Sequence, residues 1–309
     1  MRRARALLRS AFRSAASLPL AARGGLDRLD IEEFAGRSKR ALEALCRARA
    51  QPVYLGGNEA LCRILGRYKL YVDTRDAGLG AHLLLDGFWE MGLTIHIARH
   101  VRAGMAAIDV GANFGYYTVL LGALVGESGR VLAIEPAPET AAMLRRSVAL
   151  NGFEHIATVI ETAAGAGDAP ESLLFVPERE PKNAQLVASP DGLDRIPGTL
   201  HRVAQSSVDT LAADQRRIDF IKIDAEGAEE AVIAGMLATL RRDRPHLVLE
   251  FNAARARDPG ALLATLCTIY GKPRYLDLHG NVLETTPERL LRERFATDWL
   301  LVFAAPDPR

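Results

Sequence analysis

Cysteine is scarce in this chain of 309 residues, and its scarcity narrows the classes of protein to which the chain can belong. Three cysteines occur, Cys46, Cys62 and Cys267, and they are widely spaced. They are too few and too scattered for a disulfide framework or a cysteine-based zinc site. We therefore expect a protein of a reducing compartment, the cytoplasm.

Long apolar runs and an excess of one charge are also missing. The longest mainly apolar run, Tyr116–Val125, is far short of the roughly 20 residues that a membrane-spanning helix needs. Lys and Arg number 39 against 38 for Asp and Glu, so the net charge is +1. Because this balance does not favour a polyanionic partner, we expect no nucleic-acid binding. The 49% of hydrophobic residues exclude wholesale disorder.

The first 25 residues depart from this balance, because they hold six arginines and no acidic residue. Arg13 interrupts the apolar core that a secretory signal would need. One interpretation is a frayed tail. The other is a basic segment that lies on an anionic membrane surface, which would give a cytoplasmic protein a peripheral membrane contact.

Residues 1–75 are predicted to form a mainly helical extension that precedes a domain over residues 76–309. Apolar residues recur with helical spacing over residues 28–50, and Gly56-Gly57-Asn58 ends that pattern. We expect a short helix over Glu59–Leu65 and a strand over residues 69–74. Residues 83–100 are predicted to be mostly helical, with an interruption at residues 86–90.

From Gly104 onward, short β-rich runs alternate with helical segments, which predicts a parallel sheet with helices on both faces. The final runs, residues 274–278 and 299–304, flank a short helical segment and suit an added antiparallel edge strand. Residues 168–205 do not fit the alternation, so we expect an insert that serves as an acceptor lid or an extra hairpin. The expected strands cover residues 107–110, 131–134, 157–160, 220–223 and 247–251.

The strongest local signal is a glycine turn, Asp109-Val110-Gly111-Ala112-Asn113-Phe114-Gly115, between a strand and a helix. Glycine lets the backbone approach a ligand closely, and the helix start offers unpaired N–H groups. The spacing differs from the G-x-G-x-x-G of dinucleotide folds, and the Asp109 carboxylate would repel a phosphate. A ligand with an ammonium group, a sulfonium and a ribose fits better, which favours S-adenosylmethionine.

The next two strands of the predicted sheet also end in acidic residues. Glu135 follows the second strand, where a carboxylate can accept two hydrogen bonds from a ribose diol. Glu161 and Thr162 follow the third strand, and we expect them to border the adenine. A tight turn in a nucleotide-free domain would explain the glycines, but it would not explain acids at successive strand ends.

A second charged motif follows the fourth strand, Ile221-Lys222-Ile223-Asp224-Ala225-Glu226-Gly227-Ala228-Glu229. A buried charge is costly unless it is paired or hydrogen-bonded. Charges that crowd the carboxyl end of a central strand are more typical of a site than of a scaffold. The alternative is a Lys222–carboxylate pair beside an acid-rich helix start.

Residues 86–251 resemble the FkbM family of S-adenosylmethionine-dependent methyltransferases. The resemblance rests on the two motifs above, together with Gly87-Phe88-Trp89-Glu90, Glu135-Pro136 and Asn151-Gly152. It implies a class I methyltransferase (Rossmann-like) α/β fold, with a seven-stranded mostly parallel sheet, helices on both faces and an antiparallel edge strand. It also implies O-methylation of a sugar, a glycan or glycolipid, or a secondary metabolite. We take the cofactor-binding candidates from the matched motifs and strand ends: Glu90, Asp109, Gly111, Asn113, Gly115, Thr118, Glu135, Glu161 and Thr162.

Methyl transfer to an alcohol calls for a base within hydrogen-bond reach of the hydroxyl. Asp224 is the first candidate, Glu226 and Glu250 are the reserves, and Lys222 would tune or hold these acids. An alternative places Mg²⁺ between Asp224, Glu250 and Asn252. Three oxygens from separate strands are weak support, and we predict no metal.

Two further observations leave alternatives open. His96 and His100 have the helical spacing of a zinc-binding pair, but the sequence shows no third ligand, so we expect a packed or solvated pair.

The chain could also be an NAD-dependent sugar oxidoreductase, although the glycine spacing argues against it. A non-catalytic binding subunit with a methyltransferase fold is the remaining reading, but none of the acidic candidates is missing.

Overall fold

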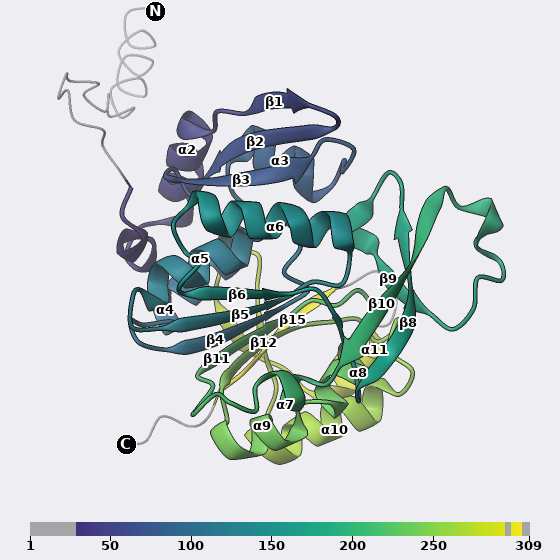
Figure 1. The fold of residues 1–309 in the computed structure, drawn as a ribbon. Helices are drawn as coiled ribbons and strands as arrows, with labels where there is room; N and C mark the ends of the chain where they lie inside the picture. The colour runs from purple at the N-terminus through teal and green to yellow at the C-terminus, as the bar shows by residue number, and fades with distance from the viewer. Residues whose placement is uncertain (1–28, 294–297, 305–309) are drawn as a thin grey trace, which may run out of the picture.

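The computed structural model describes residues 29–293 and 298–304, and its centre is an eight-stranded sheet (Figure 1). The predicted basic segment, residues 1–25, lies outside the described residues. The strand order in the sheet is β14-β13-β15-β12-β11-β4-β5-β6. These strands are β4 (Ala106–Val110), β5 (Arg130–Ile134), β6 (Ala157–Ile160), β11 (Phe220–Ile223), β12 (His246–Phe251), β13 (Arg274–Leu276), β14 (Val282–Glu284) and β15 (Trp299–Phe303).

The five strands from β12 to β6 run parallel, and β15 pairs antiparallel with β12. The chain starts this parallel block at β4, adds β5 and β6 on one side, and then returns to add β11 and β12 on the other. The order therefore reverses between β4 and β11. Such a reversal opens a crevice at the carboxyl ends of the strands, where open α/β sheets bind their ligands.

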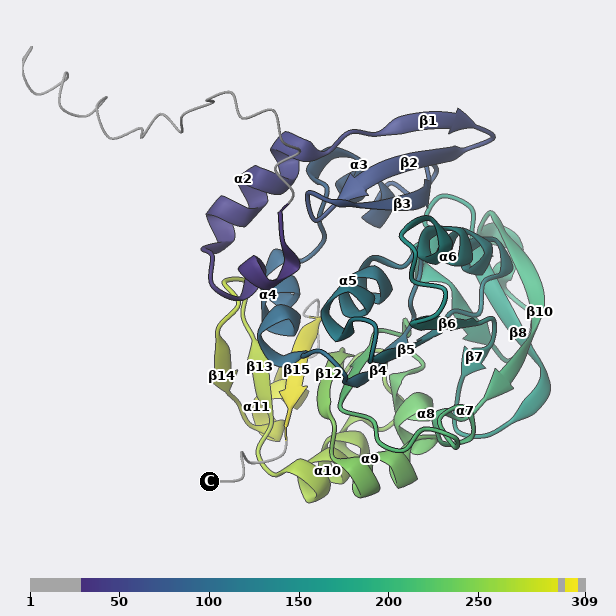
Figure 2. The ribbon, with the colours of Figure 1, turned by 60° about the vertical axis from the view of Figure 1, so that its left-hand side comes forward.

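Helices cover both faces of the sheet, as predicted (Figure 2). One face packs against α4 (Met91–His100), α5 (Tyr116–Val125) and α6 (Pro138–Leu150), with Val119 and Leu144 in the first core cluster. The other face packs against α8 (Glu229–Ala234), α9 (Leu237–Asp243) and α10 (Pro259–Tyr270), with Leu240 and Leu263 in the second cluster. The central parallel strands β4, β5, β11 and β12 are mainly apolar because both faces of the sheet are covered there.

The large sheet has eight strands, whereas the sequence led us to expect seven. The short strand β14 pairs antiparallel with β13 at the edge and makes the eighth strand. Residues 282–284 escaped prediction because all three are exposed, so no hydrophobic alternation marks them. The helix α11 (Pro287–Arg292) follows β14 and leads toward β15.

The N-terminal extension is not mainly helical in its described part. The short helix η1 (Ile31–Ala35) and α2 (Lys39–Arg49) precede an antiparallel sheet of β1 (Val53–Gly56), β2 (Glu59–Ile64) and β3 (Tyr68–Asp73). The helix expected over Glu59–Leu65 is wrong, since those residues form β2. Ala60, Cys62 and Ile64 alternate toward the core, which is the period of a strand.

The extension shares its core with the large sheet. Phe34 and Leu42 belong to the same buried cluster as Phe114 and Val119, and η1 packs against α4 and α5. The segment α3 (Leu79–Asp86) ends at Gly87, whose positive φ of 70° closes the helix, and α4 begins at Met91. The predicted interruption between these two helices is therefore present.

The insert forms a separate four-stranded sheet beside the main one. Its order is β7-β10-β8-β9, from β7 (Ala163–Ala164), β8 (Ala169–Pro177), β9 (Gln185–Val187) and β10 (Gly198–Ser206). The short helix η2 (Pro181–Asn183) lies between β8 and β9, and α7 (Val208–Leu211) follows β10. An extra hairpin, one of the two expected readings of this insert, is thus present.

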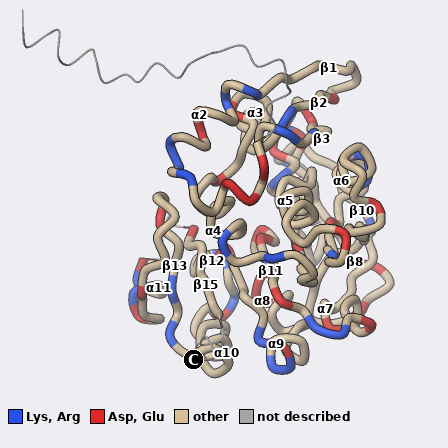
Figure 3. Tube along the Cα trace, turned by 90° about the vertical axis from the view of Figure 1, so that its left-hand side faces the viewer, with Lys and Arg blue, Asp and Glu red and all other residues tan. Residues whose placement is uncertain are grey.

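Charge and helix length add two global observations. Basic and acidic residues are interspersed over the described elements in Figure 3, in keeping with the balanced composition. Within residues 29–293 and 298–304, no helix is both long and apolar enough to cross a bilayer.

Candidate active site

A cavity of about 430 Å³ opens at the carboxyl ends of β4, β5, β11 and β12, where the strand order reverses. The residues that line it include parts of the segment before α4, the turn after β4, the start of α5, the end of β5, the turn after β11, the end of β12 with the loop that follows, and the insert. Its polar side chains include six carboxylates and three cations: Glu90, Glu135, Asp224, Glu226, Glu250 and Asp298, with Lys182, Lys222 and Arg255.

Glu135 is fixed at the end of β5 by two backbone donors. Asn113 N–H donates to Glu135 Oε2 over 2.8 Å, and Ala137 N–H donates to Oε1 over 2.9 Å. Each carboxylate oxygen can accept a second hydrogen bond, so Glu135 keeps acceptor capacity toward the cavity. Burial raises the pKa of Glu135 to about 7, although the two backbone hydrogen bonds act in the opposite direction.

Lys222 is a buried cation that joins the two sequence motifs. Its Nζ lies 3.2 Å from Asp224 Oδ2 and 3.7 Å from Asp109 Oδ1, and it donates to the carbonyl oxygen of Gly111 over 3.3 Å. Burial opposes its charge, yet Asp224 and Asp109 raise the pKa of Lys222 above its usual value. Lys222 therefore stays protonated and holds the Asp224 carboxylate at the cavity wall.

Asp109 lies beneath the cavity and does not line it. Its side chain is fully buried, and Thr118 donates to Oδ2 over 2.7 Å. Among the described residues, none donates a hydrogen bond to Oδ1, which faces Lys222 at ion-pair distance. Burial raises the pKa of Asp109, and the Lys222 charge offsets part of that rise. Asp109 and Thr118, both predicted to bind the cofactor, thus contact the network under the cavity.

Glu90 reaches the cavity from the start of α4. Tyr117 OH donates to Glu90 Oε2 over 2.6 Å, and burial raises the pKa of Glu90. The neighbouring ring of Tyr116 also lines the cavity, and its hydroxyl lies 2.8 Å from Thr94 Oγ1. Both tyrosines therefore line the cavity.

Three residues of the cavity wall have left-handed backbone conformations that are uncommon outside glycine. The φ angles are 36° at Glu90, 51° at Asn113 and 47° at Glu226. Such conformations cost roughly 1–3 kcal/mol each and tend to gather at functional sites. Half of the six positive-φ residues other than glycine in the described chain therefore lie on this one wall.

The two predicted glycines of the first turn are required by contacts within the protein. Gly111 has a φ of 71°, and a Cβ there would lie 1.8 Å from the carbonyl oxygen of Asp224. Gly115 has a φ of 100°, and its Cβ would lie 2.5 Å from Leu144 Cδ1. Gly111 lines the cavity and Gly115 does not. The turn after β4 and the turn after β11 thus touch backbone to backbone.

Arg255 organises the outer acids and was missed by the sequence reasoning. It contacts Glu226 over 2.8 Å, Glu250 over 2.9 Å, and also Asp298. Burial, followed by the charge of Asp224, raises the pKa of Glu226 to about 7 and that of Glu250 to about 9. The signal that could have found Arg255 is its position shortly after β12, on the edge that carries the other candidates.

The insert supplies one wall of the cavity, whereas Glu161 and Thr162, two of the predicted cofactor-binding residues, do not line it. Pro181, Lys182 and Asn183 of η2 line the cavity. Glu161 pairs with Arg145 over 2.8 Å at the surface, and the hydroxyl of buried Thr162 donates to the carbonyl oxygen of Ala204. Neither side chain lines the cavity, where Ala163 and Ala164 border the end of β6 instead.

The alternative magnesium site is not assembled. The Asn252 amide donates to Asp298 over 2.8 Å, its carbonyl oxygen accepts from Ala254 N–H, and Asn252 does not line the cavity.

The expectation for His96 and His100 needs a correction, because His246 of β12 joins them as a third imidazole. His246 lies 150 positions after His96, so the spacing of residues in the sequence does not reveal that the two are neighbours.

Comparisons with known proteins point to methyltransferases, and one family model covers more than half of the chain. The family model described as the methyltransferase FkbM domain matches residues 109–285, more than half of the chain. Trp89, which lies before that range, also lines the cavity.

Curated relatives match shorter segments. A protein-L-isoaspartate O-methyltransferase from Methanothrix thermoacetophila is 30% identical over 89 residues, 24% of this chain and 42% of that protein. Methyltransferase 1 from Beauveria bassiana is 27% identical over 145 residues, 42% of this chain and 57% of that protein. The chain thus spans about half the length of these relatives.

Among solved structures, the methyltransferase FkbM from Methylobacillus flagellatus aligns with 74% of this chain and 56% of its own. The sequence identity is 17% and the TM-score is 0.40.

Proposed function

Because the chain belongs to the FkbM methyltransferase family, we propose that it transfers a methyl group from S-adenosylmethionine to a hydroxyl oxygen of a sugar, glycan, glycolipid or secondary metabolite. The observation that supports this proposal best is the acid-rich cavity at the strand-order reversal, with Glu135 held at its wall and Asp224 paired with Lys222.

The residues present suit a cationic adenosine ligand. Glu135 keeps free acceptor positions that a ribose diol would fill, and the excess of carboxylates would attract an ammonium or a sulfonium. Two of these carboxylates are held by neighbouring side chains, because Tyr117 donates to Glu90 and Lys222 pairs with Asp224. A pyrophosphate would meet these carboxylates, so the wall disfavours a dinucleotide.

S-adenosylmethionine supplies a methyl group that its positive sulfur has already activated for attack by an oxygen. The chain must then bring an acceptor hydroxyl into line and take its proton. We assign the proton to the Asp224 carboxylate, which lines the cavity and is oriented by Lys222 at 3.2 Å. Lys222 also limits the mobility of Asp224, so the base would keep one position through turnover.

The outer acids suit the recognition of hydroxyl groups. Burial and the charge of Asp224 raise the pKa of Glu250, so a protonated Glu250 would donate a hydrogen bond to an acceptor oxygen. Glu226, Arg255 and Lys182 add donors and acceptors at the same mouth. A polyhydroxylated acceptor would find several partners there, which supports a carbohydrate-like substrate over an apolar one.

The proposal is tested by labelled methyl transfer from S-adenosylmethionine into a panel of sugars, glycolipids and cell-extract metabolites. We expect label in a hydroxyl-bearing product with the native chain. Asp224→Asn should lower turnover by roughly 10²- to 10⁴-fold while S-adenosylmethionine binding, measured by calorimetry, changes little.

Asp214→Asn is the matched control, because Asp214 is an exposed aspartate outside the cavity. Full activity of Asp224→Asn would remove the base assignment. Failure of the native chain to bind S-adenosylmethionine, together with retention of NAD, would overturn the proposed reaction.

A further inference from the structure

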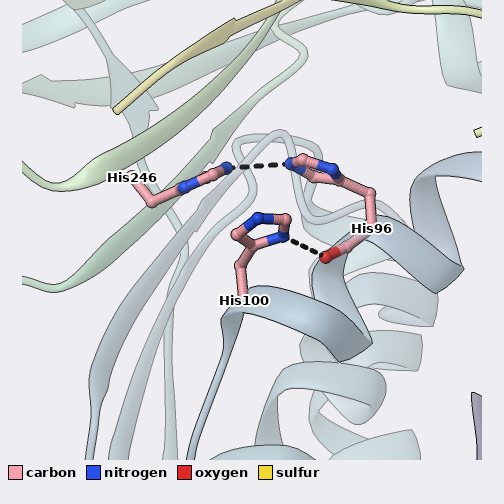
Figure 4. A group of neighbouring side chains, drawn as sticks. All are labelled: His96, His100 and His246. Atoms are coloured by element: carbon pink, nitrogen blue, oxygen red, sulfur yellow. Dashed lines mark hydrogen bonds between the residues drawn. The ribbon is translucent and has the colours of Figure 1, made fainter. Parts of the chain in front are cut away.

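Three histidines converge at the end of the sheet that lies opposite the cavity. His96 and His100 come from the last turns of α4, and His246 is the first residue of β12 (Figure 4). One nitrogen of each ring lies within 4.8 Å of the corresponding nitrogen of the others. In Figure 4 the rings turn toward a common space between the helix and the strand.

The site is separate from the cavity. His246 pairs with Phe220, the first residue of β11, and Phe220 pairs with Ala107 at the start of β4. The cavity lies at the other ends of the same strands, at Asp224 and Glu250. The histidine cluster therefore does not belong to the candidate active site.

The hydrogen bonds leave ring nitrogens suited to a metal. His100 Nδ1 lies 2.8 Å from the His96 carbonyl oxygen, which only accepts, so His100 carries its proton on Nδ1. Its Nε2 then has a free lone pair. A backbone carbonyl that fixes the far nitrogen in this way is the usual outer support of a metal-binding histidine.

The other two rings face each other through like atoms. His96 Nε2 and His246 Nε2 lie 2.8 Å apart, so one of these nitrogens carries a proton and donates it to the other. A metal would take both lone pairs once that proton moves to the far nitrogen of its own ring, and no net proton would be released. Two nitrogens on a tetrahedral zinc stand about 3.3 Å apart, so a small parting of the rings suffices.

The rings are uncharged, as metal ligands must be. Burial lowers the pKa of His96 to about 2 and that of His246 to about 3, and it also lowers the pKa of His100. Arg99, Arg102 and Arg274 add to these shifts and would weaken the binding of any cation. Arg99 and Arg102 donate to the carbonyl oxygens of Ala35, Ala98 and Val101.

We propose that His96, His100 and His246 form a binding site for a late first-row transition-metal dication, such as Zn²⁺. Three imidazoles suit zinc, nickel and copper and disfavour the hard cations Mg²⁺ and Ca²⁺. His100 is exposed, so a water would complete the fourth position from the solvent side.

The metal would tie the last turns of α4 to the first residue of β12. The first turns of α4 follow Glu90, which lines the cavity, and include Thr94, which contacts Tyr116. Binding at one end of the helix would therefore stiffen an element whose other end borders the candidate active site. The metal's role is structural and does not depend on the proposed methyl transfer.

The test is calorimetric titration of the full chain, freed of metal by a chelator and of any histidine tag, with Zn²⁺ and separately with Mg²⁺. We expect one equivalent of Zn²⁺ to bind, no Mg²⁺ to bind, and the Tm to rise with Zn²⁺. Co²⁺ should give the visible absorption of a low-coordinate site.

His100→Ala should weaken Zn²⁺ binding at least tenfold and abolish the Co²⁺ absorption, and it should fold because His100 is exposed. His155→Ala is the control, since His155 pairs with Glu127 at the surface. Equal Zn²⁺ affinity in the two variants, or no Zn²⁺ binding by the native chain, would overturn the proposal. Activity plays no part in this readout, so its outcome is independent of the proposed reaction.

Discussion

Glu135 offers the clearest test at the scale of a single residue, because its pKa of about 7 lies in the physiological range. The ribose diol would bind the charged form, so a protonated Glu135 must release its proton on binding. S-adenosylmethionine affinity should therefore fall by up to about tenfold per pH unit below pH 7 and level off above it. Calorimetry from pH 5.5 to 8.5 measures this profile.

Glu135→Gln should weaken binding about 30-fold at pH 8, because a charge-assisted hydrogen bond worth about 2 kcal/mol is lost. The same change should flatten the pH profile. Glu161→Gln, which alters a surface glutamate outside the cavity, serves as the control. An unchanged profile in Glu135→Gln would show that another group controls binding.

Single residues also show how far the sequence could predict this site. Glu135, Asp224 and Glu250 line the cavity because parallel strands bring their carboxyl ends to one edge, which the sequence pattern reveals. His246 was missed because its partners in α4 are distant in sequence, whereas Arg255 was overlooked although it lies only five residues after its partner Glu250. A pairing across 150 positions leaves no local periodicity to read.

At the scale of elements, the contact between the turns after β4 and β11 makes a testable demand on Gly111. A Cβ at that position would meet the Asp224 carbonyl at 1.8 Å, in addition to the strain of a φ of 71°. We expect Gly111→Ala to cost more than about 3 kcal/mol of unfolding free energy, and to displace Asp224.

Gly152→Ala is the matched control, because Gly152 has a φ of 75° and open space around its Cβ direction. It should cost about 1–2 kcal/mol, the conformational penalty alone. Urea unfolding measures both values. Equal costs in the two variants would show that the two turns do not depend on close backbone contact.

The elements were predicted unevenly from the sequence. The strands and helices between residues 106 and 251 have strong periodic patterns and short connections, and most of them form where expected. The strand β2 was mistaken for a helix because Glu, Ala, Leu and Arg favour helices locally. Its pairing with β1 and β3 overrides that preference.

The helical segment expected after β11 is broken into α8 and α9 at Gly235. The Cβ of any other residue at this position would lie 1.9 Å from the Gly165 carbonyl oxygen.

At the scale of the whole molecule, the shared core predicts that the extension and the large sheet unfold together. Phe34 is fully buried in η1, which packs on α4 and α5. Phe34→Ala should lower the unfolding free energy by about 3–5 kcal/mol and shift one cooperative transition as a unit. Leu85→Ala, at a residue that is 74% exposed, should change it by less than about 0.5 kcal/mol.

Scanning calorimetry of both variants measures this coupling. Two separate transitions in Phe34→Ala, with the upper one unchanged from the native chain, would mean that residues 29–75 form an independent unit.

The contact of Gly111 with Asp224 has a consequence for protein engineering. The two motifs are separated by more than a hundred positions in the chain, yet their backbones pack in direct contact. A chimera whose crossover falls between them would inherit a loop from each parent, with the backbones no longer matched. Recombination libraries built on this scaffold should therefore exchange both loops as one block.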